Sequence, residues 1–339
     1  MPERVRVALI GAGRIGKRHA ATLASAIPRA ELAVIADVHG PAAASLAAEV
    51  RCPRWSDDPI AVLADPAVNA IVIASSTDSH APLIVAAADA GKQIFCEKPI
   101  ALDLEATDLA LEAVARAGVR LQMGFQRRFD AAYRKAKDLI DTGALGRIEA
   151  IRDTMRDPAP ASRAYLESSG GLYRDMTIHN FDCVRWMMGE EVTELFAMGS
   201  AIVSPLFREI DDIDTSVISL RFANDGLGVI DNSRRSGFGY DVRTEVFGSE
   251  GALMIGYSRD TPMLRLDANG IHSDHIHWFL ERFDQAYIDE LRVFVDGIVD
   301  GTSPPVDGDD ARAAMALAYA AEASRRENAP VSPARFDRT

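Results

Sequence analysis

The feature that most constrains this chain is a glycine pattern directly after its first apolar run. Gly11-Ala12-Gly13-Arg14-Ile15-Gly16 has the form G-x-G-x-x-G and follows Val5–Ile10, which is typical of a buried strand. Between a strand and a helix, such a turn cradles the pyrophosphate of a dinucleotide. Gly11 permits the tight turn, Gly13 lets the backbone approach the phosphates, and Gly16 allows close helix packing. The helix N-terminus adds free N–H groups and a positive dipole.

An acidic residue follows at the expected distance. Asp37 comes 21 residues after Gly16, where a second strand ends. A carboxylate there accepts hydrogen bonds from the adenosine ribose hydroxyls and repels a 2′-phosphate, so the sequence favours NAD over NADP. The alternative is a solvated aspartate in the turn before His39-Gly40-Pro41.

Two styles of patterning divide the chain. The first third alternates short, continuous apolar runs with alanine-rich helical stretches, which predicts a doubly wound parallel sheet of the α/β Rossmann type. The predicted strands there are Val5–Ile10, Glu31–Ala36, Ala70–Ala74, Gln93–Cys96 and Val119–Met123, and the helical stretches include Ser79–Ala90 and Leu104–Ala117.

After about residue 124, strands separated by turn signals predict an antiparallel, half-exposed sheet. We therefore expect a Rossmann domain over residues 1–124 and an α+β domain for substrate binding and oligomerisation over 125–339. Its predicted strands are Ile148–Thr154, Thr193–Ser200, Asp214–Phe222, Gly226–Asn232 and Arg243–Gly248, and its predicted helices are Thr177–Met188, Ala286–Val299 and Asp309–Arg326.

Composition excludes several classes of partner. The net charge of −13 repels a nucleic-acid backbone and an anionic membrane surface. The three cysteines are widely spaced and form no metal or disulfide pattern, which favours a reducing, cytoplasmic setting. No signal-peptide pattern precedes the glycine motif, and no apolar run approaches the length of a membrane span.

Further segments carry a family resemblance over essentially the whole chain. They occur in family order and are Ala74 to His80, Glu97-Lys98-Pro99, Gly124 to Asp130, and Gly170 to His179. Together they resemble the Gfo/Idh/MocA oxidoreductases. Segments around Asp157, Asp211 to Thr215, Arg234 and Tyr240, and the stretch from Phe279 to Tyr287, are similar to the inositol dehydrogenases of that family. One departure is Asn180, where those enzymes usually carry Asp.

The resemblance implies NAD-dependent oxidation of a ring hydroxyl of a cyclitol, with myo-inositol as the expected substrate. It implies an open, largely antiparallel second sheet and a homotetramer. It also implies catalytic roles for Lys98, Asp175 and His179. The implied cofactor-binding residues are Gly11, Gly13, Arg14, Ile15, Gly16, Asp37, Ser76, Thr77, His80, Glu97 and Lys98, and the implied polyol-binding residues are Lys98, Arg127, Asp157, Asp175, His179, Asp182 and Tyr240.

The residue types suit alcohol oxidation, which sends a hydride to nicotinamide and a proton to a base. Imidazole titrates near neutral pH, so His179 is the natural base. Asp175 lies four residues earlier, so on a helix it shares a face with His179 and can orient the ring. Lys98 ends a parallel strand, where doubly wound folds bind ligands, and its ammonium can stabilise a developing alkoxide.

Other interpretations remain open from the residues alone. Asp175 and His179 also fit a solvated helix pair, Lys98 a surface lysine, and Arg127 with Asp182 a structural ion pair. A related pyranose dehydrogenase or a non-catalytic NAD-binding sensor are the competing functions. His272, His275 and His277 cluster with Asp274 at a spacing that invites a metal. Hydride transfer to nicotinamide needs no metal, however, and the cluster lies in a Gly/Ser/Asp loop, so we expect no metal site and a role at an interface or at the rim of the active site instead.

Overall fold

The chain forms two compact units, and the computed structural model describes residues 4–256 and 259–338. The first unit comprises Met1–Phe129 and Gln285–Ala313, and the second comprises Asp130–Asp284 and Ala314–Thr339. A division at residue 124 leaves the segment Gln285–Ala313 with the second domain, whereas in the structure it belongs to the first unit.

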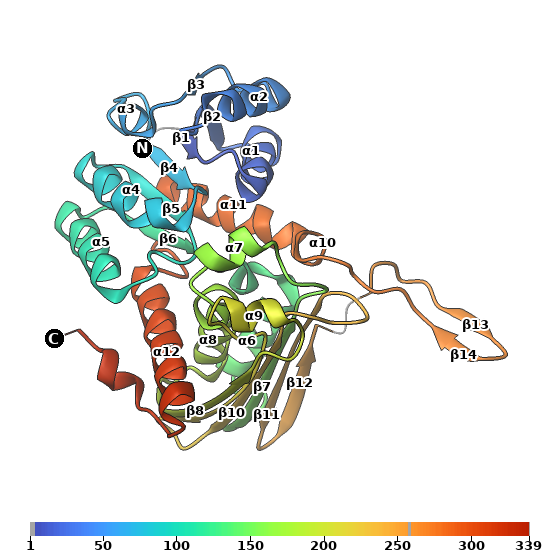
Figure 1. The fold of residues 1–339 in the computed structure, drawn as a ribbon. Coiled ribbons are helices and arrows are strands. Elements are labelled where there is room, and N and C mark those ends of the chain that lie inside the picture. The colour runs from blue at the N-terminus through green and yellow to red at the C-terminus, as the bar shows by residue number, and fades with distance from the viewer. Residues whose placement is uncertain (1–3, 257–258, 339) are drawn as a thin grey trace. The chain divides into compact units, whose positions relative to one another are not determined.

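The first unit contains a six-stranded parallel sheet in the order β3-β2-β1-β4-β5-β6 (Figure 1). Central strands such as β4 are buried at every residue, as expected for a sheet covered on both faces. The predicted doubly wound fold is confirmed. The strands are β1 (Val5–Ile10), β2 (Ala30–Ala36), β3 (Trp55–Ser56), β4 (Ala70–Ile73), β5 (Gln93–Glu97) and β6 (Leu121–Gly124).

One helix that covers this sheet comes from late in the chain. In α11 (Asp284–Asp300), Leu291, Phe294 and Val295 pack into the core formed by β1, β2 and the helices beside them. The other helices of the unit are α1 (Arg14–Ser25), α2 (Gly40–Val50), α3 (Pro59–Leu63), α4 (Thr77–Asp89) and α5 (Leu104–Ala117), with a 3₁₀ turn η1 (Gln126–Phe129).

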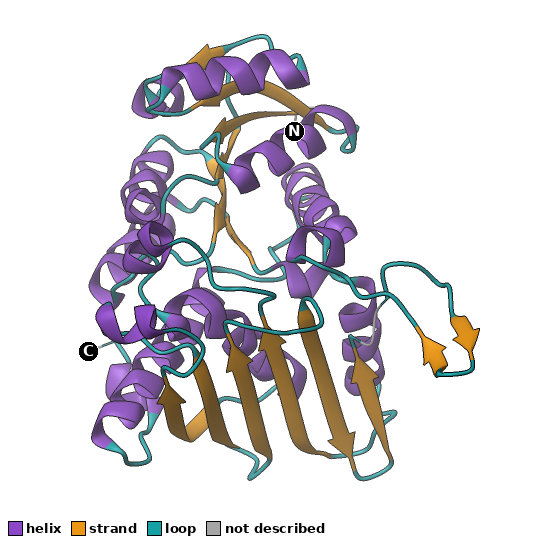
Figure 2. Cartoon of the chain, turned by 45° about the vertical axis from the view of Figure 1, so that its right-hand side comes forward, coloured by secondary structure: helices purple, strands orange, loops and turns teal. Residues whose placement is uncertain are grey.

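The second unit contains a six-stranded sheet in the order β12-β11-β7-β10-β9-β8 (Figure 2). Strands β7 and β10 pair parallel and all other neighbours pair antiparallel, so the predicted mainly antiparallel sheet is confirmed. Turns at Asn224-Asp225-Gly226 and at Gly248–Gly251 join neighbouring strands, as the sequence predicts. The strands are β7 (Ile148–Arg156), β8 (Val192–Ser200), β9 (Thr215–Phe222), β10 (Leu227–Ser233), β11 (Asp241–Gly248) and β12 (Gly251–Ile255).

Burial alternates along these strands, so one face of the sheet is covered and the other is exposed. In β9, Ile218 and Leu220 are buried, whereas Val217 and Ser219 between and beside them are exposed. Helix α8 (Ile178–Met188) packs against β7. The other helical segments of this unit are α6 (Ala131–Asp141), α7 (Arg163–Ser168), the π-helical turn η2 (Tyr173–Thr177), α9 (Pro205–Glu209), α10 (Phe279–Arg282), most of α12 (Gly308–Glu327) and η3 (Pro333–Phe336).

A hairpin of β13 (Arg265–Asp267) and β14 (Gly270–His272) extends away from the rest of the second unit (Figures 1 and 2). Its turn contains Asn269-Gly270. Among the described residues, no helix has both the length and the apolar character that crossing a lipid bilayer requires.

Candidate active site

The glycine turn has the geometry of a dinucleotide cradle. Gly11 has φ +105°, and a Cβ there would lie 2.4 Å from the carbonyl oxygen of Ala74. At Gly16 a Cβ would lie 2.0 Å from the carbonyl oxygen of Gly11. At Gly13, by contrast, a Cβ would meet no atom within 4 Å. Gly11 and Gly16 therefore bring β1, β4 and α1 together, whereas Gly13 keeps open the space that a pyrophosphate needs.

Asp37 follows β2 and is tied to the same turn. Its Oδ2 accepts a hydrogen bond from the Ala12 N–H at 2.7 Å, and its Oδ1 accepts one from the His39 N–H at 2.8 Å. The carboxylate is partly exposed. Each carboxylate oxygen has two lone pairs, so Asp37 can hold the turn and still accept a hydrogen bond from a ribose hydroxyl.

The remaining predicted cofactor residues lie in or near this turn and at the carboxyl ends of β4 and β5. Ser76 is the N-cap residue of α4 and Thr77 its first residue, while Glu97 ends β5 and Lys98 follows it. Arg14 and Ile15 begin α1. The carboxyl edge of a parallel sheet is where doubly wound folds bind ligands.

His80 joins two of these segments from within the fold. It is buried, and its Nδ1 lies 2.7 Å from the carbonyl oxygen of Pro99, while its Nε2 lies 3.1 Å from that of Ser75. Burial lowers the pKa of His80, so the ring is neutral at neutral pH and has one N–H to donate. The shorter contact, to Pro99, is its hydrogen bond, and this bond ties the Lys98-Pro99 segment to α4.

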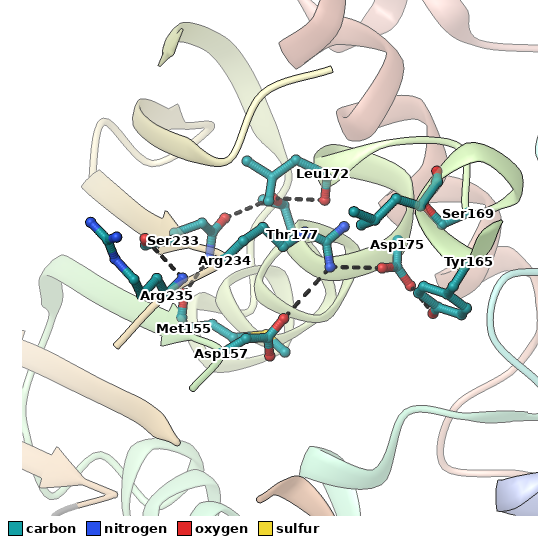
Figure 3. A network of polar contacts seen from close by, with 12 residues as sticks. Met155, Asp157, Tyr165, Ser169, Leu172, Asp175, Thr177, Ser233, Arg234 and Arg235 are labelled. Carbon is teal, nitrogen blue, oxygen red and sulfur yellow. Dashed lines mark hydrogen bonds and ion pairs between the residues drawn. The ribbon is translucent and has the colours of Figure 1, made fainter. Parts of the chain in front are cut away.

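In the second unit, Asp175 lies at the centre of a buried polar network (Figure 3). Its Oδ2 accepts a hydrogen bond from Arg234 Nη1 at 2.8 Å, and its Oδ1 accepts one from the Tyr165 hydroxyl at 2.7 Å. Arg234 Nη1 also lies 3.6 Å from Oδ2 of Asp157, whose N–H bonds the Ser233 carbonyl. The predicted residues Asp157 and Asp175 are thus brought together by an arginine.

Arg234 is 3% exposed, and it carries the positive charge between these two carboxylates. Burial alone would lower the pKa of Arg234. The charges of Asp175 and Asp157, with the hydrogen bond to Asp175, raise it above its ordinary value. Arg234 therefore stays charged and offsets part of the negative charge that the two carboxylates bring to the site.

His179 is buried in the first turn of α8, four residues after Asp175 in the turn η2. The π-helical turn runs directly into α8, so Asp175 and His179 lie in one continuous helical stretch. Asp182 is buried one turn further along α8. Tyr240 precedes β11 and packs edge-on against the rings of Phe279 and Phe283. In the first unit, Arg127 is 1% exposed in η1.

Asn180, where the sequence departs from its family, belongs to the support of the site. Its Nδ2 donates to Asp153 Oδ2 at 2.7 Å, and its Oδ1 accepts from Asn232 Nδ2 at 3.0 Å. It thereby joins α8 to β7 and β10. An aspartate at 180 would place a second carboxylate against Asp153, so the amide suits this pairing.

The loop histidines do not gather around a common point. His272 pairs with Asp267 at 3.2 Å, His275 packs against the Phe238 ring, and the Asp274 carboxylate accepts hydrogen bonds from Thr261. These contacts are structural contacts of the loop and the hairpin.

Two family models match the chain, one in each compact unit. Residues 5–125 match the oxidoreductase family with an NAD-binding Rossmann fold, and residues 133–254 match the GFO/IDH/MocA C-terminal domain. The chain belongs to the GFO/IDH/MocA oxidoreductase family. It is therefore an NAD-dependent oxidoreductase.

Relatives are similar along their full length. Myo-inositol 2-dehydrogenase of Thermotoga maritima is 41% identical over 96% of this chain and 98% of its own. The NAD(+)-linked scyllo-inositol 2-dehydrogenase of Bacillus subtilis is 37% identical over 98% of this chain and 97% of its own. A crystal structure of scyllo-inositol dehydrogenase from Lactobacillus casei with NAD(H) and scyllo-inositol has a TM-score of 0.91 at 30% identity, covering 98% of this chain and 99% of that one.

Two residues of this GFO/IDH/MocA site lay outside the predicted set. Arg234 was noted in a similar segment but given no role, and Tyr165 was not singled out. Tyr165 lies only ten residues before Asp175, on α7. The glycines at 170 and 171, both with positive φ, separate α7 from η2, so the chain can fold back and bring the hydroxyl to the carboxylate.

Proposed function

We propose that this chain oxidises one ring hydroxyl of a cyclitol, myo-inositol first, to the ketone. The observation that carries the proposal is the Asp157–Arg234–Asp175 network beside His179. This network offers several fixed polar groups to a ligand with many hydroxyls. Relatives of the chain are named as dehydrogenases of myo-inositol and scyllo-inositol. Unmatched buried polar groups are costly, so such a site discriminates against ligands that lack hydroxyls.

In this proposal His179 is the general base. It removes the hydroxyl proton while the carbon loses its hydride, so the substrate gives up two electrons and becomes a ketone. Bound NAD supplies the hydride acceptor. Asp175, held by Arg234 and Tyr165, is a fixed negative charge four residues from His179 and favours the imidazolium that forms.

Lys98 completes the proposed catalytic set. Its ammonium would hydrogen bond the reacting oxygen and stabilise alkoxide character as the proton leaves. Arg127, Asp157, Asp182 and Tyr240 are proposed to bind the other hydroxyls. The remaining residues at the ends of β4 and β5 are proposed to contact the cofactor.

The test is an NAD-linked absorbance assay with myo-, scyllo- and D-chiro-inositol, glucose, xylose and galactose. We expect an inositol to give the highest kcat/KM. If a pyranose exceeds every inositol by about two orders of magnitude, the chain is a sugar dehydrogenase instead. Saturable NAD binding with no NADH formed from any polyol would indicate a sensor.

We also infer a homotetramer that acts in the cytoplasm without a nucleic-acid partner. The net charge of −13 and the free thiols of Cys52, Cys96 and Cys183 support the setting and the partner class. The exposed apolar face of the second sheet supports self-association.

A further inference from the structure

A second cluster of titratable groups lies inside the first unit. His19 from α1, Glu97 from β5 and Glu290 from α11 each place one possible ligand atom within 4.8 Å of the others. His19 and Glu290 are both 0% exposed. None of the roles given above to the glycine turn or to the polyol pocket uses His19 or Glu290, so the cluster needs its own explanation.

His19 and Glu97 form a defined pair. Their Nε2 and Oε1 atoms are 2.7 Å apart. A carboxylate can only accept, so the imidazole carries its hydrogen on Nε2 and donates it to Glu97. The other side of Glu97 is equally confined, because a Cβ at Gly124 would lie 2.9 Å from its Oε2. The end of β5 is therefore held between α1 and β6.

Glu290 has a different environment. Within residues 4–256 and 259–338, neither of its carboxylate oxygens has a hydrogen-bond donor. Its backbone carbonyl accepts from Gln122 Nε2 at 2.8 Å, which fixes this turn of α11 beside β6. An ionised carboxylate buried without a donor is strongly disfavoured, and more so beside the charge of Glu97.

We propose that Glu290 is a neutral carboxylic acid that directs its O–H toward the carboxylate of Glu97. With His19 it clamps the carboxyl end of β5 and so positions Lys98. Glu290 is a positioning residue, and its role in turnover rests on the function proposed for Lys98.

The surrounding charges agree with one proton held by this cluster. Burial, and then the charge of Glu97, raise the pKa of Glu290 well above its ordinary range. Other titratable groups near the cluster include Tyr287 of α11, whose ring lies 6.2 Å from that of His19, and Cys96 of β5 and His80 of α4, both of which sense the charge of Glu97. Lys98 follows Glu97 at the end of the strand that the cluster clamps.

The first test measures protonation without using activity. A carboxyl whose pKa is higher in the folded state than in the unfolded state loses its stabilising effect as pH rises above the unfolded value of about 4.3. Glutamine has the shape of the neutral acid but does not titrate, so Glu290→Gln does not lose stability in this way. Its melting temperature should therefore rise relative to that of wild type as pH increases from about 5 to 9. Infrared spectra should show a neutral carboxylic acid band in wild type that Glu290→Gln lacks.

The control is Glu112→Gln, an exposed carboxyl on α5 of the same unit. The difference between its melting temperature and that of wild type should not change with pH in this way. If the Glu290→Gln difference stays constant with pH, or the variant fails to fold, Glu290 is not a neutral acid and the proposal is wrong. A stoichiometric divalent metal in the purified protein, lost in Glu290→Gln, would show a metal site instead.

The second test concerns positioning. Glu290→Gln keeps a donor, so its kcat should stay within about threefold of wild type, with the alkaline limb of the pH profile at higher pH. Glu290→Met removes the donor, and displacing Lys98 should lower kcat at least about tenfold. Equal turnover in the two variants would overturn the positioning role. Failure of the inositol assay itself would leave the melting and infrared results valid, so the two proposals can be judged separately.

Discussion

At the scale of single residues, the proposed mechanism assigns the acid–base chemistry to His179. Losing a positioned general base typically lowers the rate by about 10² to 10⁴. His179→Ala should show a kcat loss in that range and still bind NAD, because the glycine turn and Asp37 are unchanged. The double variant with Asp175→Asn should be scarcely slower than His179→Ala, since Asp175 then has no ring to orient.

The measurement is kcat at saturating NAD, with NAD affinity from fluorescence titration and a melting curve for folding. A folded His179→Ala protein that keeps kcat within about fivefold of wild type would remove His179 from the base role. The neutral form of Lys98 would then be the next proton acceptor to test.

Arg234 is the residue whose loss should disturb the substrate site most broadly. Arg234→Met leaves Asp157 and Asp175 without the cation between them, and removing one partner of a buried ion pair costs about 3–5 kcal/mol. Arg234→Lys should restore this only in part, because a compact ammonium differs in reach and shape from the guanidinium that places Nη1 between both carboxylates. We expect a lower free energy of unfolding and a lower kcat in both variants, with Met worse than Lys.

Arg235→Met is the matched control, since Arg235 is the exposed neighbour whose side chain points away from Asp175 in Figure 3. The free energy of unfolding measured in urea and the kcat of this variant should both remain near the wild-type values. Equal effects at 234 and 235 would mean that the buried charge network is not what stabilises the site.

Sequence could supply the acids and the base but not the cation between them. Asp157, Asp175 and His179 lie in segments with recognisable spacing. Arg234 meets Asp175 across 59 residues of chain, and this contact depends on β10 pairing parallel with β7. A parallel pairing inside a hairpin-rich sheet has no local sequence signal, because alternation of apolar residues specifies a strand but not its neighbour.

At the scale of elements, the glycine turn makes a sharp prediction. Gly16→Ala must move backbone, because its Cβ would lie 2.0 Å from the Gly11 carbonyl oxygen, so this variant should lose stability as well as cofactor binding. Gly13→Ala adds a methyl group to open space. It should therefore melt near wild type and bind NAD at least about tenfold more weakly, since the methyl group occupies the path of the pyrophosphate.

Melting curves and NAD titrations of the two variants decide this. If Gly13→Ala is as unstable as Gly16→Ala, or if it binds NAD normally, the assignment of Gly13 to the phosphates is wrong.

The strands and helices themselves were largely predictable, and the exceptions have physical reasons. Val5–Ile10 and Leu104–Ala117 match their elements at both ends: a glycine follows each element, and the N-cap residue Asp103 precedes the helix. The sequence does not show that α11 packs into the first unit. Its apolar face is that of any amphipathic helix, and nothing local distinguishes the sheet that it covers.

At the scale of the whole molecule, the exposed face of the second sheet is the feature that calls for a partner. The pairing registers place Met198 and Val217 in one row across the strands, Val229 and Met254 in the next, and Leu227 and Phe247 in a third. All six side chains are between 39% and 67% exposed. The sequence predicted a half-exposed sheet, but not that large apolar residues would lie on its exposed face. In a sequence, apolar residues on both sides of a strand indicate a strand that is buried on both faces.

Six large apolar side chains exposed on one sheet face, with Arg152 and Glu245 between Val229 and Met254, are more typical of an interface between copies than of a monomer surface. Val229→Asp places a charge near the middle of the face, opposite Arg152 and Ser219 on the neighbouring strands, so the strand itself should tolerate it. Sedimentation analysis should show that wild type is a tetramer and that Val229→Asp forms smaller species. Ile60→Asp, at an apolar residue of α3 that is 58% exposed against 39% for Val229, should remain tetrameric. A monomeric wild type, or a Val229→Asp variant that sediments like wild type, would place the contact between copies elsewhere. The charge acts only where the residue is desolvated by a partner, so the contrast between positions 229 and 60 reports the face that is covered in solution.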